Sequence, residues 1–263
     1  MNHPISAALM CHAPIVIPQI AGREAAAVAQ STRAMENAAK VVCDSNPELL
    51  VLVSPHTPRL RTDFLLASND RLTGSFTDFG HSLALELPGA PATVRLLLDA
   101  AAQSPGIVAS MLRTLDHGSL VPLYFLRQAG LRAQVLIIAL PMEPHLEQCK
   151  RMGQWLANNL PNRWALVASG DMSYRLKPGA PAGYHQRASK FDSAVVKAVR
   201  AGQLDEAFGI SEELRDLAAE DVLDSLAVAA GALGSAVLPA PEASYEGPFG
   251  VGYLVSALAR NAA

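Results

Sequence analysis

The sequence predicts a single α/β domain spanning residues 1–263, in which helices flank a central sheet that is mostly parallel or mixed. Short apolar runs rich in Val, Ile and Leu are typical of buried strands. Helical patterns alternate with these runs, which favours parallel strands joined by crossover helices. The chain has 263 residues, of which 50% are hydrophobic and 17% charged. It is therefore long enough to bury one sizeable core.

The first half of the chain begins with an apolar strand over residues 5–10. The Ala-rich residues 25–42 then predict an amphipathic helix, and residues 50–54, with the sequence LVLVS, predict a second buried strand. Residues 62–87 hold short extended pieces between polar turns, for which we expect an antiparallel extension. A further helix is expected over residues 91–103.

The second half opens at His117, where the sequence DHG leads into an apolar segment and predicts a loop-helix junction. Residues 133–140 and 164–169, AQVLIIAL and WALVAS, predict two more buried strands. Helices are expected over residues 143–160, 189–201, 204–217 and 218–230. Near the end of the chain we expect a short strand over residues 235–238 and a glycine-rich turn leading into a closing strand or helix over residues 245–255.

Charge and composition narrow the class of partner. The net charge is −3, and no run of Lys or Arg resembles a nucleic-acid footprint, so a small molecule is the expected ligand. We find neither a leader pattern at the first residues nor an apolar run of about 20 residues, so we expect a cytoplasmic protein that does not enter a membrane. Three cysteines at unrelated spacings predict neither a disulfide framework nor a zinc site.

Two histidines stand where buried strands end. His12 follows the first predicted strand and His56 follows the strand over residues 50–54. Ligands collect at the carboxyl ends of parallel strands, so we expect the two imidazoles to converge. With one carboxylate they would form the two-histidine, one-carboxylate site of non-haem iron oxygenases. The candidate carboxylates are those of Glu246, Glu242, Asp171 and Asp116.

Six motifs together resemble a known family. In chain order they are CHAPIVIP, SPHTPR, LDHGSLVPL, SGDMSYRL, GAPAGYHQRASKFD and SYEGPFGVGYL. They are similar to motifs of the class III extradiol ring-cleavage dioxygenases, the family of the catalytic subunit of protocatechuate 4,5-dioxygenase, and most similar to the branch that is associated with the AmmeMemoRadiSam system and related to Memo. The resemblance runs nearly from end to end.

The resemblance implies an Fe(II) site whose ligands fall on His12, His56 and Glu246. It also implies a catechol or an ortho-aminophenol as substrate, bound through its two adjacent heteroatoms, with O2 as the second reactant. In such a scheme the metal orients and polarises both reactants.

An acid/base group beside the metal is also implied, and here the sequence departs from the family. The motif usually ends in histidine, as SGDLSH, whereas this chain has Tyr174 at that position. A tyrosine with its ordinary pKa of about 10 is a poor base near neutral pH. We therefore also consider His185 as the base, and His117 as a residue that stabilises bound substrate or oxygen.

Two other functions compete with ring cleavage. A Memo-like protein would keep the metal site without the ring-cleavage chemistry, which the change to Tyr174 allows. The same ligands could instead hold zinc for hydrolysis. For each function we expect a homo-oligomer, and a partner subunit is compatible with the sequence.

Overall fold

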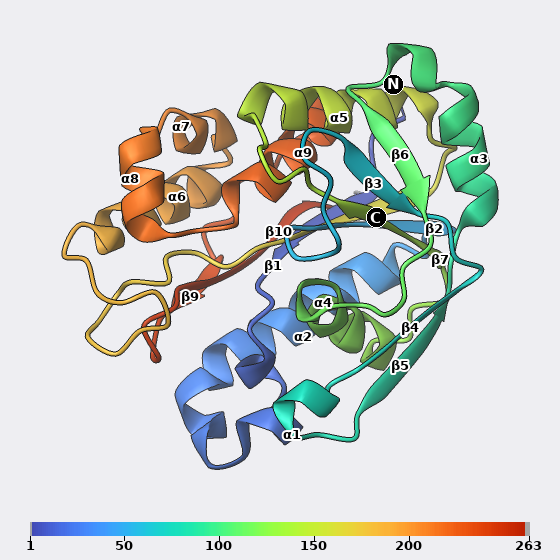
Figure 1. Ribbon diagram of the computed structural model, residues 1–263. Coiled ribbons are helices and arrows are strands. Elements are labelled where there is room, and N and C mark those ends of the chain that lie inside the picture. The colour runs from blue at the N-terminus through green and yellow to red at the C-terminus, as the bar shows by residue number, and fades with distance from the viewer. Residues whose placement is uncertain (1, 261–263) are drawn as a thin grey trace.

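The computed structural model describes residues 2–260 and shows a mixed eight-stranded sheet between layers of helices (Figure 1). The strands follow each other across this sheet in the order β6-β3-β7-β2-β8-β1-β10-β9. Their bounds are β1 (Ser6–Met10), β2 (Leu49–Ser54), β3 (Phe64–Ala67), β6 (Ile107–Ser110), β7 (Gln134–Ala139), β8 (Trp164–Ser169), β9 (Ser244–Glu246) and β10 (Tyr253–Arg260). The predicted fold class is thus confirmed.

The four central strands β7, β2, β8 and β1 are parallel to one another, so their carboxyl ends lie along one edge of the sheet. On one side, β3 is antiparallel to β7 and carries β6 parallel to itself. On the other side, β10 is antiparallel to β1, and β9 is antiparallel to β10. The antiparallel strands make the sheet mixed, and the parallel centre creates the edge at which polar groups collect.

Helices cover both faces of the sheet (Figure 1). The α-helices are α1 (Pro18–Ala21), α2 (Ala29–Asp44), α3 (Pro91–Asp99), α4 (His117–Gln128), α5 (Leu146–Asn159), α6 (Ala188–Ala201), α7 (Leu204–Phe208), α8 (Glu212–Ala218) and α9 (Leu223–Leu233). Short 3-10 segments are η1 (Pro14–Val16), η2 (Gly22–Val28), η3 (Thr77–Phe79), η4 (Ala101–Gln103) and η5 (Gly234–Ala236). The structure describes no helix that is both long and apolar enough to cross a membrane.

Strand β2 shows why both faces need a cover. Leu50 and Leu52 belong to the apolar core that includes residues of α2 and α4. Val51 and Val53 belong to the core that includes residues of α5 and α9. Successive side chains of a strand point to opposite faces, so an uninterrupted apolar run requires packing on both sides.

Helix α9 packs unusually close to α5. A Cβ atom at Gly153 would lie 1.9 Å from the backbone oxygen of Val228, and one at Gly231 would lie 2.0 Å from that of Lys150. Only glycine permits this approach. The contact fixes α9 and the loop that precedes it, which contributes to the site described below.

Residues 62–87 divide between two sheets. Strands β4 (Arg71–Ser75) and β5 (Ala84–Pro88) form a separate antiparallel hairpin, as predicted for this region. The earlier piece, β3, instead joins the main sheet.

Two local predictions were wrong, and one strand was not predicted. The expected helix over residues 204–217 is split into α7 and α8, because a turn at Gly209 separates them. Residues 235–238 form no strand and instead follow the short 3-10 segment η5. Strand β6 had no counterpart among the predicted elements.

Candidate metal centre

His12 and His56 meet at the carboxyl edge of the sheet, as predicted. Each lies two residues beyond its strand, β1 or β2, and β8 separates these two strands. Their Nε2 atoms are 3.0 Å apart. His12 is fully buried, whereas the side chain of His56 is 33% exposed. His12 is therefore enclosed by the protein, whereas the side of the pair that His56 forms is open to solvent.

The carboxylate beside this pair is that of Asp221. Its Oδ2 atom lies 3.1 Å from His56 Nε2 and 3.4 Å from His12 Nε2. Its other oxygen, Oδ1, accepts a hydrogen bond of 2.7 Å from the backbone N–H of Asp171, which follows β8. One oxygen thus anchors the side chain while the other faces the histidines.

The loop that carries Asp221 is fixed by its neighbours. Glu220 Oε2 accepts hydrogen bonds from the backbone N–H groups of Val222 and Leu223 at the start of α9. A Cβ atom at Gly170 would lie 2.5 Å from Val222 Cα, so glycine lets the loop approach the end of β8. The sequence prediction missed Asp221. A usable signal was the group of acids Glu220, Asp221 and Asp224 at the start of an otherwise apolar helix.

Ser169 determines which nitrogen of His12 carries the proton. Its hydroxyl donates to the carbonyl of Gly118 over 2.6 Å, and this carbonyl can only accept. The same hydroxyl lies 3.0 Å from His12 Nδ1, so Nδ1–H donates to it. Whenever this imidazole is neutral, as a metal ligand must be, its lone pair is therefore on Nε2 and faces His56 and Asp221. This is the tautomer that a metal ligand needs.

His117 is the third histidine of the cluster. It is the first residue of α4, and Asp116 caps the helix by accepting a hydrogen bond from the Ser119 N–H. The ring centroid of His117 lies 4.3 Å from that of His56 and 5.4 Å from that of His12. A ligand atom from each of the three histidines lies within 4.8 Å of the others. Burial, followed by the charges of the other two imidazoles, lowers the pKa of His117 to about 4.

Tyr174 also reaches the cluster. Its hydroxyl lies 3.3 Å from His12 Nε2, and its single proton can go to Asp171 Oδ2 at 3.1 Å or to Asp221 Oδ2 at 3.4 Å. Burial and then the charges of these two aspartates raise the pKa of Tyr174 far above its ordinary value. The phenol therefore keeps its proton and acts here as a hydrogen-bond donor.

Carboxylates dominate the charge around His12. Burial by itself would lower the pKa of this imidazole, but the charges of Asp171 and Asp221 outweigh that effect and raise it to about 9. For Asp221, burial would raise the pKa, yet the adjacent histidines hold it well below its usual range. The site therefore favours positive charge.

Two predicted residues lie elsewhere. Glu246 Oε1 accepts hydrogen bonds from the backbone N–H and the hydroxyl of Ser31, over 2.7 and 2.6 Å, in the first turn of α2. A carboxylate is favourable at a helix amino terminus, which gives Glu246 a capping role. The His185 Nδ1 atom accepts from the Arg187 N–H, and among the described residues His185 is not one of the histidines whose ligand atoms come together.

The arrangement of donors fits a metal ion. With bonds of about 2.1 Å, neighbouring ligand atoms are separated by about 3.0 Å at right angles and about 3.4 Å at the tetrahedral angle. The three separations among His12 Nε2, His56 Nε2 and Asp221 Oδ2 are 3.0, 3.1 and 3.4 Å. Two imidazoles and one carboxylate suit iron or zinc.

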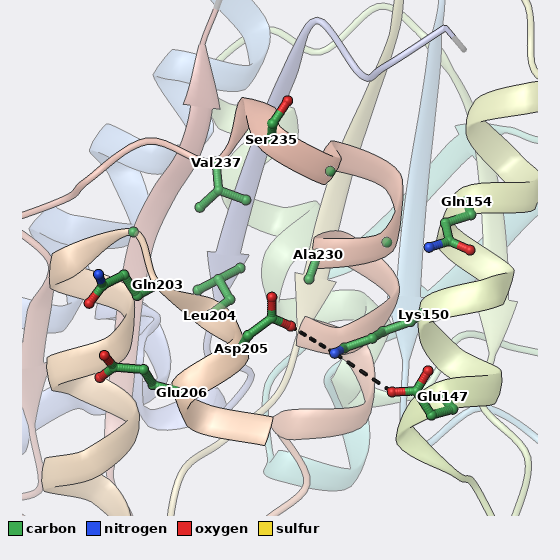
Figure 2. Close-up of a pocket in the computed structure, with 13 residues that line it drawn as sticks. Glu147, Lys150, Gln154, Gln203, Leu204, Asp205, Glu206, Ala230, Ser235 and Val237 are labelled. Atoms are coloured by element: carbon green, nitrogen blue, oxygen red, sulfur yellow. Dashed lines mark hydrogen bonds and ion pairs between the residues drawn. The ribbon is translucent and has the colours of Figure 1, made fainter. Parts of the chain in front are cut away.

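A hollow of about 710 Å³ between α5, α7 and α9 offers no comparable site (Figure 2). Lys150 Nζ lies 2.7 Å from an oxygen of Asp205 and 3.8 Å from one of Glu147, so its charge is already neutralised. None of the three clustered histidines lines this hollow.

Comparison with known proteins identifies the family. The family model described as the catalytic LigB subunit of aromatic ring-opening dioxygenase matches residues 6–256. The chain belongs to this family. The LigB assignment confirms the resemblance to class III extradiol dioxygenases and indicates a fold of the ring-opening dioxygenase type.

Two individual proteins are similar to this LigB family member. Protein CA_C1420 of Clostridium acetobutylicum is 29% identical over 264 residues, which are 95% of this chain and 56% of that protein. The chain thus spans about half the length of this relative. The crystal structure of the uncharacterized protein JW3007 from Escherichia coli matches with a TM-score of 0.62 at 17% identity, over 97% of this chain and 99% of the other. This second likeness shows a shared fold.

Proposed function

We propose that this protein is a non-haem Fe(II) extradiol dioxygenase that opens the ring of a catechol or an ortho-aminophenol with O2. The observation that carries the proposal is the convergence of His12, His56 and Asp221 within 3.4 Å of one another at an edge that is open beside His56. When bound, ferrous iron would supply Lewis-acid and one-electron chemistry to the aromatic diol and to dioxygen.

We propose Asp221 as the carboxylate ligand in preference to Glu246, which was predicted from the family resemblance. Asp221 Oδ2 faces both imidazoles, whereas Glu246 Oε1 accepts two hydrogen bonds from Ser31. The lone pair on His12 Nε2, secured by Ser169, completes the set of donors. A group that hydrogen-bonds to the other nitrogen of a metal-binding histidine fixes the orientation and the basicity of that ligand.

His117 would hold a substrate hydroxyl beside the metal in this proposal. Burial and then the neighbouring imidazoles lower the pKa of His117, which favours its neutral form, so one of its ring nitrogens is free to accept a hydrogen bond from a substrate hydroxyl. Tyr174 keeps its proton and donates to the two aspartates, which makes it a poor base. His185, the other predicted base, bonds to the backbone of Arg187 at the start of α6, and this position does not support that role.

The proposal is tested by loading the protein with Fe(II) without oxygen, adding a panel of catechols and ortho-aminophenols, and then admitting air. We expect oxygen uptake together with a ring-opened product that absorbs in the near-ultraviolet or visible range. The His56→Ala variant should give neither. An iron-loaded wild-type protein that consumes no oxygen with any member of the panel would refute ring cleavage.

A second function is favoured by one observation. The Tyr174 hydroxyl lies 3.3 Å from His12 Nε2, at the position where the family motif has histidine. A Memo-like protein that binds metal without cleaving rings is consistent with this replacement. Tight metal binding without oxygen uptake would support that function, and zinc as the main metal after purification without added metal would instead favour hydrolysis.

A further inference from the structure

An exposed aromatic ring stands beside the histidine cluster. Phe79 is 41% exposed, and its side chain is large and apolar. Its ring centroid lies 5.9 Å from that of His117, with the two planes at 70°. This is the edge-to-face geometry that aromatic pairs prefer. Phe79 thus adds an apolar surface next to a group of imidazoles and carboxylates.

The turn that carries Phe79 is well determined. It is the 3-10 segment η3, in which the Phe79 N–H donates to the Phe76 carbonyl over 3.0 Å. Gly80 ends the turn with a φ of 78°, a conformation that favours glycine. Phe76 is fully buried and packs edge-to-face against Tyr124 of α4. The ring centroids of Phe79 and Phe76 are 6.4 Å apart, so the exposed ring packs beside a buried one.

The hairpin of β4 and β5 is tied to the helix that carries His117. The Leu115 N–H donates to the Thr73 carbonyl over 2.8 Å. A Cβ atom at Gly74 would lie 2.8 Å from a side-chain atom of Leu120 and 3.0 Å from Leu115 Cβ. The hairpin, whose loop carries Phe79, therefore packs closely against the start of the helix that carries His117.

We propose that Phe79 is a specificity-determining residue that contacts the aromatic ring of the substrate. A catechol that binds through its two oxygens must place its ring carbons away from the ligands, and the surrounding groups of His12, His56, Asp221 and Tyr174 are polar. Phe79 offers an apolar contact for those carbons, held against His117. The inference rests on the proposed function, because it assumes an aromatic ligand at the cluster.

The test is calorimetric titration of the Zn(II)-loaded protein with catechol and, separately, with acetohydroxamate. Both compounds chelate a metal through two oxygens, but only catechol has an aromatic ring. Phe79→Ala should weaken catechol binding by about three- to tenfold, as expected for the loss of one aromatic contact. It should leave acetohydroxamate binding and metal content unchanged. Phe79→Tyr should restore catechol binding, and Leu96→Ala, at a 47% exposed leucine on α3, is the matched control.

The outcomes separate the inference from the proposed function. If wild-type protein binds acetohydroxamate but no catechol or aminophenol, the proposed function fails and the inference fails with it. If wild-type protein binds catechol and Phe79→Ala binds it equally well, only the role of Phe79 is overturned. Equal weakening of both chelators would mean that the substitution disturbs the metal site, which also overturns the ring contact.

Discussion

Asp221 Oδ2 lies 3.1 Å from His56 Nε2, although the two residues belong to opposite halves of the chain. His56 follows a central strand, whereas Asp221 lies between two helices. This approach makes Asp221, and not Glu246, the carboxylate that we expect to bind metal.

Replacing Asp221 by Asn should therefore remove metal binding. The amide keeps the size of the side chain but removes its charge, and we expect affinity to fall by more than the roughly 10- to 100-fold that follows the loss of an outer partner. Glu246→Gln should keep the metal, since that carboxylate accepts from Ser31. Metal content after gel filtration and a competition titration measure metal binding by both variants. If Glu246→Gln lost the metal and Asp221→Asn kept it, Glu246 would be the ligand instead.

Ser169→Ala tests the orientation of His12. Without the hydroxyl, His12 Nδ1–H loses its acceptor, and the preference for a lone pair on Nε2 weakens. We expect metal affinity to fall by about 10- to 100-fold. Ser193→Ala is the control, because that hydroxyl donates only to the Ser189 carbonyl within α6. Unchanged affinity in Ser169→Ala, with the fold intact by circular dichroism, would show that Ser169 does not select the tautomer.

Gly118→Ala should disturb the site through packing. A Cβ atom there would lie 2.7 Å from Ser54 Oγ and 3.1 Å from His56 Cδ2. Overpacking of this kind costs about 1–3 kcal/mol of stability. Displacement of His56 should also weaken metal binding. Gly209→Ala is a suitable control, because the nearest atom to its Cβ would be 3.6 Å away. Urea unfolding and metal titration of both variants provide the comparison.

Tyr174→Phe should retain the metal but alter turnover. The hydroxyl donates to Asp171 and Asp221, so its removal leaves the three ligand atoms in place while changing the hydrogen bonds around them. We expect oxygen uptake with catechol to change while metal content stays constant. An identical rate in the variant would place the proton path at other residues, with His117 the first to examine.

The buried carboxyl group of Asp192 should make stability depend on pH. Burial raises its pKa to about 6, although hydrogen bonds from Tyr245 and from the Ser173 N–H oppose that rise. In the unfolded chain the pKa is about 3.9. The folded state thus binds the proton more tightly, so this contribution to stability is complete below about pH 4 and is lost as the pH rises through about 6.

The expected loss from Asp192 is about 3 kcal/mol, since each pKa unit corresponds to about 1.4 kcal/mol. Asp192→Asn should remove this part of the pH dependence, because the amide can accept from Ser173 and donate to Tyr245 without titrating. Unfolding in urea at pH 4 and pH 7 measures the difference. Glu220, whose pKa burial raises to about 7, contributes with the same sign in both proteins. An equal decline in wild type and variant would contradict the prediction for Asp192.

The sequence predicted His12 and His56 because their positions depend on local patterns. A histidine that directly follows an apolar strand lies at the carboxyl end of that strand. In a parallel sheet the carboxyl ends of all strands lie along the same edge. Asp221 could not be predicted in this way, because its place depends on the packing of α9 against α5 at Gly153 and Gly231. Glu246 was inferred to be a metal ligand from a motif. The group that its carboxylate contacts depends on the packing of β9 against α2, which places Ser31 beside it. Hydrophobic periodicity predicts helices and strands. Contacts between segments that are distant in the sequence decide which side chains come together in the site.

The position of β8 between β2 and β1 affects the order in which the chain can fold during synthesis. Strands β1 and β2 leave the ribosome first, yet they do not touch each other in the finished sheet, since both pair with β8. Until residues 164–169 have emerged, the loops that carry His12 and His56 have no shared support. A nascent chain that ends before β8 should therefore be unable to hold an ion between these two imidazoles, and metal capture should mark a late stage of folding.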